Sequence, residues 1–568
     1  MALGVAELPT LPTRARGGLR WWAQLLVVLM PAAVVLAAGW HRRWMNEDAF
    51  INLRVVDQIF AGHGPVFNAG ERVEAFTSPL WIGALVVIRA TLGQVLRMEW
   101  ATVVACLAAS TAAFLVGAVA ARRLHDDNAF VVPLGLVFVA AVPVVWDFST
   151  SGLEVGITWL WLAISWSVLL GVARAPVPRE GWARRTGLIV LGLGPVVRPD
   201  LGLVSVCLVA GWLLIAHEPR RILGDLAAAF AAPIVYQVFR MGYFAALVPS
   251  TALAKDAGGL HVGQGLRYGV DLIDTYWLWV PLLGIAVVIG LNIARSPRSL
   301  GVACGAMVLG GLLHASYIVL IGGDYMHGRL LLPALFAVAL PASLGVASLD
   351  LRSFGLIGLG AVWALVCATT LRFDQPLASQ FTVISISDWR ELSGAQVVPR
   401  EAHNPIFLNG TQIHSLYDRG GRGFIPLLKR APVAGRKHNE LVVSLGSIGI
   451  PAYHAGHDVF VVDLGGLAEP IAARTSIVPG RAAGHRKQVD GAWYEARFAA
   501  HRHGSRVAAA SRALSCSPLS DLITAIDAPL TPGRFLTNIW NSFSFTRLHI
   551  PADPVRAEQD LCRRKRVR

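Results

Sequence analysis

Long apolar segments alternate with short polar ones along the first two thirds of this chain. The first apolar segment runs from Leu19 to Trp40, and about 20 apolar residues in a helix cross a hydrocarbon core. A cleaved signal peptide is the alternative for this segment, because Ala37-Ala38-Gly39 is a run of small residues, but further spans follow it. We predict about eleven spans, near residues 20–40, 100–121, 130–146, 155–173, 186–197, 201–216, 222–240, 275–294, 299–321, 329–348 and 354–372.

The positions of the arginines indicate how these spans are oriented, because cytoplasmic loops are rich in Lys and Arg. Arginines follow or separate the apolar segments at Arg122, Arg123, Arg174, Arg179, Arg184, Arg185, Arg220, Arg221, Arg295, Arg298 and Arg352. If these loops and the N-terminus are cytoplasmic, segment 79–96 does not cross, and we predict a juxtamembrane or re-entrant helix on the outer side. An odd number of spans then places residues 373–568 outside the plasma membrane.

Two domains follow from this topology. Residues 1–372 form a polytopic α-helical membrane domain, and residues 373–568 form an extracytoplasmic domain of mixed α/β character, with strand-like runs at Asn439–Leu445 and Asp458–Leu464. Cys516 and Cys562 both lie on the predicted oxidising side, so we expect a disulfide between them. The other cysteines fall in apolar segments and are interpreted as small core residues: Cys106, Cys207, Cys304 and Cys367.

Composition supports a membrane protein and narrows its chemistry. The chain has 568 residues, of which 54% are hydrophobic and only 15% are charged, which excludes a disordered chain. Its net charge of +14 is typical of a nucleic-acid binder, but much of the excess lies in loops between apolar segments, so we expect a lipid bilayer and no nucleic acid as partner. No Walker loop, nucleophile elbow or zinc-ligand spacing occurs, so ATP-driven transport, serine hydrolysis and a zinc site are not favoured.

An acidic pair, Glu47 and Asp48, follows directly after the first apolar segment. A carboxylate at the outer face of a membrane can act as base or nucleophile in sugar transfer, and the pair could also hold a divalent cation. The alternative is an ordinary helix cap with acidic residues in its first turn.

The segment Gly322-Gly-Asp-Tyr-Met-His-Gly-Arg329 is the most informative polar stretch, because it lies between two strong apolar segments. Its glycines allow a ligand to approach the backbone. Arg329 has the forked geometry that suits phosphate oxygens, and His327 can add a second donor. A glycine-rich turn with an arginine extending to the interface is the alternative. Elsewhere, Arg198 and Asp200 flank Pro199, where we expect an ion pair that stabilises a broken hairpin.

Four motifs resemble those of the terminal arabinofuranosyltransferase (AftB) family of actinobacteria, within the GT-C glycosyltransferases. They are Asn46-Glu-Asp-Ala-Phe-Ile, Glu74-Ala-Phe-Thr-Ser-Pro-Leu-Trp81, Gly323-Asp-Tyr-Met-His-Gly-Arg-Leu-Leu-Leu-Pro333 and Val461-Val-Asp-Leu-Gly-Gly-Leu467. The resemblance implies a decaprenyl-phosphoryl-arabinofuranose donor and transfer to the ends of arabinan in arabinogalactan and lipoarabinomannan, with a β-(1→2) linkage. The acidic site of that family is often Asp-Asp, so Asp48 is the stronger catalytic candidate and Glu47 the weaker one.

Roles for further residues come from combining this resemblance with residue chemistry. For the donor phosphate we expect Arg329, His327, Lys255 and Arg54. For the donor sugar and the lining of the site we expect Asp324, Tyr325, Thr77, Ser78 and Trp81. Aromatic rings of the outer domain can stack on acceptor sugars, and the candidates, each of which has a core role as the alternative, are Trp389, Tyr453 and Trp493.

A secondary transporter or lipid flippase is the main alternative function, because a broken hairpin at Pro195–Pro199 fits transporters as well. A transporter should place charges near the bilayer midplane and show paired halves. Here the charged clusters gather at one predicted face and no internal repeat is visible. A glycan-binding protein with the spans as anchor is a third possibility, although so many spans exceed what an anchor requires.

Overall fold

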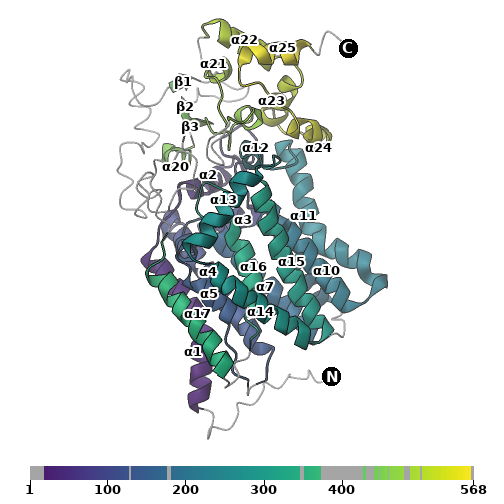
Figure 1. Ribbon diagram of the computed structural model, residues 1–568. Coiled ribbons are helices and arrows are strands. Elements are labelled where there is room, and N and C mark those ends of the chain that lie inside the picture. Colours follow the sequence, from purple (N-terminus) through teal and green to yellow (C-terminus); the bar gives the residue numbers. More distant parts are fainter. Residues whose placement is uncertain are drawn as a thin grey trace.

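The computed structural model describes residues 18–126, 129–175, 181–345, 351–372, 427–429, 441–446, 448–457, 459–478, 487–498 and 502–563. A bundle of helices makes up most of this part of the chain, and a smaller layer of strands and short helices covers one end of the bundle (Figure 1). The start of α1 (Gly18–His41) lies at the opposite end of the bundle from this layer (Figure 1).

The helices of residues 1–372 follow one another along the chain, with a longer connection at residues 61–78. Before the glycine-rich turn at Gly322 they are α1, α2 (Glu47–Phe60), α3 (Pro79–Leu92), α4 (Met98–Arg123), α5 (Leu134–Ala141), α6 (Pro143–Phe148), α7 (Val155–Arg174), α8 (Trp182–Gly192), α9 (Gly194–Val197), η1 (Pro199–Leu201), α10 (Gly202–Ala216), η2 (Pro219–Arg221), α11 (Ile222–Phe244), α12 (Ser250–Ala254), α13 (Val262–Thr275), α14 (Trp279–Arg295) and α15 (Arg298–Leu320). After it come η3 (Arg329–Leu331), α16 (Leu332–Ala342) and α17 (Leu351–Thr369).

Among the described residues, six helices are long and apolar enough to cross a membrane, or seven if α13 and α14, bent by 91°, count as one span. The polytopic helical fold is therefore confirmed. Of the other predicted spans, 130–146, 186–197 and 329–348 are short or interrupted helices, whereas 354–372 corresponds to α17, a helix of 19 residues. Segment 130–146 is divided into α5 and α6 at Pro143, where a missing N–H breaks the ladder. At eight residues, α5 rises only about 12 Å at 1.5 Å per residue.

The predicted juxtamembrane segment 79–96 contains α3, a helix of 14 residues, about 21 Å long at 1.5 Å per residue and so shorter than a hydrocarbon core. Ser78 accepts a hydrogen bond from the Trp81 backbone N–H, and Pro79 occupies the first turn, where no N–H is needed. The helix packs on α2, near the strand-containing layer (Figure 1). These features agree with a surface position, which stays a prediction.

The C-terminal region contains strands and helices in the residues described. β2 (Leu441–Leu445) and β3 (Val459–Asp463) are parallel, and β1 (Leu427–Lys429) pairs antiparallel with β2, so the two predicted strands are confirmed. The sheet is accompanied by α20 (Ile450–Ala455), η4 (Ala472–Arg474), α21 (Ala492–Phe498), α22 (Ser505–Leu514), α23 (Leu519–Asp527), α24 (Pro532–Thr546) and α25 (Pro554–Arg563).

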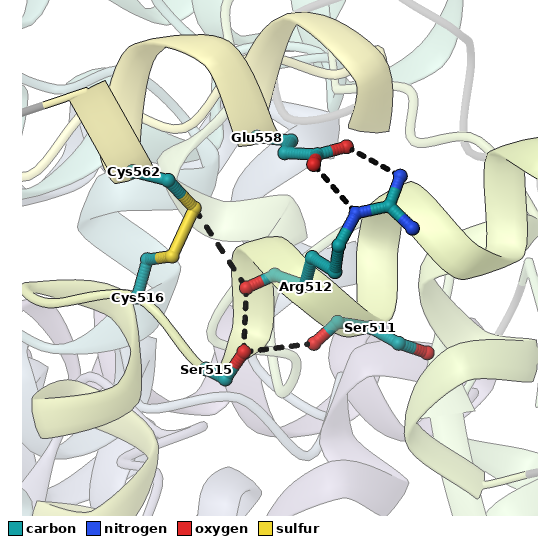
Figure 2. Close-up of a disulfide and its surroundings, with 6 residues drawn as sticks. All are labelled: Ser511, Arg512, Ser515, Cys516, Glu558 and Cys562. Atoms are coloured by element: carbon teal, nitrogen blue, oxygen red, sulfur yellow. Dashed lines mark hydrogen bonds and ion pairs between the residues drawn. A yellow bond between two sulfur atoms is a disulfide. The ribbon is translucent and has the colours of Figure 1, made fainter.

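A disulfide between Cys516 and Cys562 fastens α25 to the end of α22, as the sequence predicts (Figure 2). Beside it the Arg512 guanidinium donates two hydrogen bonds to Glu558 of α25. The four remaining cysteines are buried and free, which confirms their interpretation as core residues.

Three aromatic side chains form the centre of the bundle. Phe114 of α4 lies 5.2 Å from Phe336 of α16 and 6.0 Å from Trp159 of α7, measured between ring centroids. Such pairs add about 0.5–1.5 kcal/mol each beyond simple burial. They pack α7 and α16 against α4. Glu154 directly precedes α7, and Arg329 begins η3, which leads into α16. The packing of the core thus holds the positions of two ionisable residues.

Candidate functional site

A cavity of about 150 Å³ lies at the end of the bundle that faces the C-terminal region. Its wall combines residues from α2, the loop before α3, the two residues before α7, η1, α12, the end of α15 and η3, together with Leu467 from the C-terminal region. The polar residues that line it are Asp48, Asn52, Thr77, Glu154, Arg198, Asp200, Thr251, Lys255, Tyr317 and Arg329.

Asp48 lies in the first turn of α2, half-buried against the cavity. Its backbone N–H donates to the Asn46 side chain over 2.8 Å, so the helix cap is Asn46 and not an acidic residue. The Tyr325 hydroxyl donates to Asp48 Oδ2 over 3.0 Å. The N-terminus of a helix stabilises a negative charge, and one hydrogen bond leaves further lone pairs of the carboxylate available. Asp48 can therefore take a proton or attack an electrophile in the cavity.

Glu47 differs from its neighbour in its environment. Its carboxylate is buried and accepts a hydrogen bond from the backbone N–H of Gly449, in the C-terminal region. It does not line the cavity. Within the described ranges, no group of three or more His, Cys, Asp or Glu residues is arranged to hold a metal ion.

Arg329 and Lys255 supply positive charge to the cavity wall. Gly323, with a φ of +72°, begins the turn that brings Arg329 here, and a Cβ at this position would meet the Tyr268 ring at 2.4 Å. Arg329 Nε lies 2.7 Å from Asp324 Oδ2, and Lys255 Nζ lies 4.0 Å from Asp324 Oδ1. One buried carboxylate thus faces two cations, so these three side chains together carry one positive charge, which suits an anionic ligand at this part of the wall.

A second group of charged residues lies on the same wall. Arg198 Nη1 donates to Glu154 over 2.6 Å, and Arg198 Nε donates to Asp200 over 3.0 Å. Asp200 also lies 2.7 Å from the buried imidazole of His314. The predicted ion pair of Arg198 and Asp200 is confirmed, but the sequence did not suggest that it faces the cavity. Glu154 was not among the expected site residues, although an ionisable residue at the end of an apolar helix is the signal that points to it.

Four of the expected site residues lie elsewhere. The Arg54 guanidinium is buried and donates to the carbonyls of Phe67, Ala452, Gly456 and Val459, so its donors are already used and we drop it as a phosphate ligand. Ser78 caps α3, and Trp81 donates to the Gly152 carbonyl over 3.0 Å. His327 is buried 5.5 Å from the Tyr276 ring and is not among the residues that line the cavity.

The three aromatic residues expected to bind acceptor differ in position. Trp493 is 0% exposed, and its indole N–H donates to the Ala552 carbonyl, so no ring face is available to a sugar and the core interpretation is the correct one. Tyr453 is half-buried beside Phe50 of α2, 5.6 Å away. Trp389 lies outside the described residues.

The C-terminal region is joined to α2 and its following loop by several contacts besides Glu47. The Asn68 side chain exchanges two hydrogen bonds with the backbone of Val461 in β3, at 2.8 and 3.0 Å. The Ser250 hydroxyl of α12 donates to the Gly466 carbonyl over 3.2 Å. Since Leu467 lines the cavity directly, this region completes the cavity wall and positions the helix that carries Asp48.

Comparisons with known proteins agree with the motifs. Residues 423–560 match the AftB family C-terminal domain. The chain is 31% identical over 600 residues to the terminal β-(1→2)-arabinofuranosyltransferase of Mycobacterium tuberculosis, with 92% of this chain and 95% of the relative covered. It is 30% identical over 585 residues to the protein of the same name from Corynebacterium glutamicum, with 90% and 84% covered. No solved structure matches it. The chain belongs to the terminal β-(1→2)-arabinofuranosyltransferase family, as its four motifs indicated.

Proposed function

We propose that this protein transfers arabinofuranose from decaprenyl-phosphoryl-arabinofuranose to the ends of cell-wall arabinan, in arabinogalactan and lipoarabinomannan, and forms β-(1→2) linkages. Two relatives that carry the name of this activity cover most of the chain. The single structural observation that carries the proposal is the meeting of Asp48 with Arg329 and Lys255 in one cavity wall. Such a site offers a carboxylate for a sugar hydroxyl and two cations for a phosphate.

The reaction assigns a role to each of these groups. The bond between the anomeric carbon and the donor phosphate breaks, and decaprenyl phosphate leaves with the electron pair beside Arg329 and Lys255. A bond forms from the anomeric carbon to an acceptor hydroxyl oxygen, and the hydroxyl proton passes to Asp48. The donor and the product are both β, so configuration is retained. Retention requires either a carboxylate nucleophile or an attack on the face of the leaving phosphate. In the first route Asp48 bonds to the anomeric carbon as the phosphate leaves, and the acceptor oxygen then displaces the Asp48 carboxylate, which takes the hydroxyl proton. In the second route Asp48 takes the proton only.

Tyr325 orients Asp48, Asp324 holds the two cations in place, and Thr77 can contact the donor sugar from the cavity wall. For the acceptor we retain Tyr453 and the C-terminal domain, residues 373–568. We also propose that the protein lies in the plasma membrane with a cytoplasmic N-terminus, an extracytoplasmic C-terminal domain and about eleven spans. The start of α1 and the C-terminal layer lie at opposite ends of the bundle, which supports this topology (Figure 1). The arginine-rich connections are expected to lie at the same end as the start of α1 and to face the cytoplasm.

The test uses the full-length protein in detergent with decaprenyl-phosphoryl-arabinofuranose labelled in the sugar and an oligoarabinoside acceptor. We expect labelled acceptor with a terminal 2-linked β residue by linkage analysis, together with released decaprenyl phosphate. A flippase would instead move the intact donor across proteoliposomes without cleaving it. Transport without cleavage, or a different linkage in the product, would refute the proposed function.

A further inference from the structure

Helix α24 packs on the end of span α11 and lies beside the C-terminal region's other helices (Figure 1). Phe535 of α24 covers Gly242 so closely that a Cβ there would meet its ring at 2.3 Å. Asn538 donates to the Gly242 carbonyl over 3.0 Å, and the Leu247 backbone N–H donates to the Thr546 hydroxyl over 2.8 Å. These contacts fix α24 at the end of α11 that is remote from Arg220 and Arg221.

The opposite face of α24 is apolar and exposed. Leu536, Trp540 and Phe543 are exposed by 61%, 77% and 46%, and they lie at positions i, i+4 and i+7, which share one face of a helix. Thr531 caps the helix by accepting from the Arg534 backbone N–H, so the helix is a defined element. Leaving such a face in water costs about 25 cal/mol of free energy for each Å² of apolar surface, relative to burying it.

The neighbouring surface of α11 shows what covers this face. Ile234, Val235 and Val238 of α11 are exposed, and only 11% of this span's apolar window is buried inside the protein. Val235, Val238 and Gly242 are spaced at three and four residues, so they form one stripe along α11. Phe535 lies on the last residue of that stripe. Helix α24 therefore lies where the exposed apolar surface of α11 ends, and in a membrane lipid acyl chains cover that surface of α11.

We infer that α24 is an interfacial helix of the C-terminal region, with Leu536, Trp540 and Phe543 inserted at the boundary between headgroups and acyl chains. Its depth fits, because α11 ends at Phe244 and α24 rests on Gly242, one turn or less from that end. Tryptophan is favoured at this depth, where its ring is apolar and its N–H stays hydrated. The helix would hold the region that carries Leu467 at a fixed height above the bilayer.

The test places an environment-sensitive fluorophore at Trp540→Cys in the full-length protein, and at Val555→Cys on α25 as the matched control. The native free cysteines are buried and the other two form the disulfide, so labelling favours the introduced thiol. The protein is inserted as single copies into nanodiscs of phosphatidylethanolamine and phosphatidylglycerol, with nitroxide-labelled lipid as one quencher and aqueous iodide as the other. No substrate is present, so the result is independent of the transfer reaction.

We expect lipid nitroxide to quench the label at 540 at least about twofold more than the label at 555, and iodide to show the reverse order. Equal quenching at both positions would refute the inference, because the face would then be in water. Protection from iodide without quenching by the lipid would refute it too, since another part of the protein would then cover the face. A second copy is excluded by the single-copy discs. Leu536→Cys repeats the measurement if Trp540→Cys does not fold.

Discussion

Asp48 carries the central prediction at the scale of single residues. Asp48→Asn keeps the size of the side chain but removes the base, so we expect kcat to fall by about 10²- to 10⁴-fold with donor binding preserved. Tyr325→Phe removes the hydroxyl that donates to Asp48, and we expect a loss of at least roughly tenfold, because a hydrogen bond to a charged group contributes about 1.5–3 kcal/mol. Single-turnover transfer with labelled donor measures both.

Glu47→Gln is the matched control for Asp48→Asn. A glutamine retains an acceptor oxygen for the Gly449 N–H, so this variant should keep most of the activity. If Asp48→Asn retained more than about a tenth of the wild-type rate, its assignment as base or nucleophile would fail. A loss in Glu47→Gln equal to that in Asp48→Asn would instead show that the two carboxylates act together.

Lys255 tests the site proposed for the donor phosphate. It is partly exposed, and Asp324 keeps Arg329 as partner when the lysine is removed. Lys255→Met should raise the KM for the donor roughly tenfold or more, because a charge-assisted hydrogen bond to phosphate is lost. Arg329→Lys retains a charge but loses the forked geometry, and should raise it as well. Arg267→Met, an exposed cation outside the cavity, should leave KM unchanged, and equal KM values in all variants would contradict the assignment.

The sequence predicted the residue types of the site, but it could not show which of those side chains are buried by partners from distant parts of the chain. Asp48, Lys255, Thr77 and Arg329 were expected at the site and line the cavity. Arg54 was not distinguishable from them, because three of the four carbonyls that bind it lie some 400 residues further along the chain. Trp493 has the residue type of a sugar-binding platform, and only its tertiary environment shows that both ring faces are packed.

At the scale of elements, length and apolar continuity were sufficient for the long helices. The segments predicted near 20–40, 100–121, 155–173 and 299–321 correspond to α1, α4, α7 and α15. Short elements were harder, because proline and neighbouring helices decide where they end. Segment 186–197 is divided between α8 and α9, and the helices α21 and α23, of 7 and 9 residues, are too short for periodicity to identify.

The disulfide should contribute strongly to the stability of these short C-terminal helices. It joins residues 46 apart, and closing a loop of that length can stabilise a fold by up to about 4 kcal/mol. We expect the C-terminal transition of Cys516→Ser/Cys562→Ser to melt at lower temperature than that of the wild type, with the same shift in wild type after reduction. A cross-linked peptide in a non-reducing digest is the direct measurement, and two free thiols there would contradict the pairing.

At the scale of the whole molecule, a buried cluster joins the loop before α3 to the C-terminal region and should respond to pH. Arg497 forms ion pairs with Glu71, Glu469 and Asp527 at 2.5, 3.2 and 3.1 Å. Burial raises the pKa of Glu469 to about 7, although Arg497 opposes the shift. The folded protein therefore binds this proton more tightly than the unfolded chain, and the free energy of unfolding should fall as pH rises from about 4.5 to 7.

Thermal melting of the C-terminal region between pH 5 and pH 8 measures this effect. Glu469→Gln is neutral at every pH, so its melting temperature should depend less on pH than that of the wild type. The corresponding change in the free energy of unfolding of the wild type across this range is up to about 3 kcal/mol. Glu558→Gln, on the surface of α25, should keep the wild-type slope. Identical slopes for Glu469→Gln and wild type would show that Glu469 is ionised throughout.

The contacts between the C-terminal region and α2 change which parts of the chain are expected to form the donor site. The sequence suggested that donor chemistry belongs to the membrane part and acceptor binding to residues 373–568. Leu467 lines the same cavity as Asp48, and the Asn68 side chain is bound by β3. We therefore expect removal of the C-terminal region to impair donor turnover as well as acceptor use.

Gly449→Ala tests this coupling without truncation. A Cβ at Gly449 would lie 1.8 Å from the Glu47 carbonyl oxygen, so the methyl group must displace the first turn of α2, where Asp48 is held. We expect transfer to fall at least about tenfold, since small displacements of a reacting group are costly, while the disulfide and the fold of the C-terminal helices persist. Gly446→Ala, whose Cβ meets nothing within 4 Å, should be active. Equal activity of the two variants would mean that the C-terminal region does not position the catalytic helix.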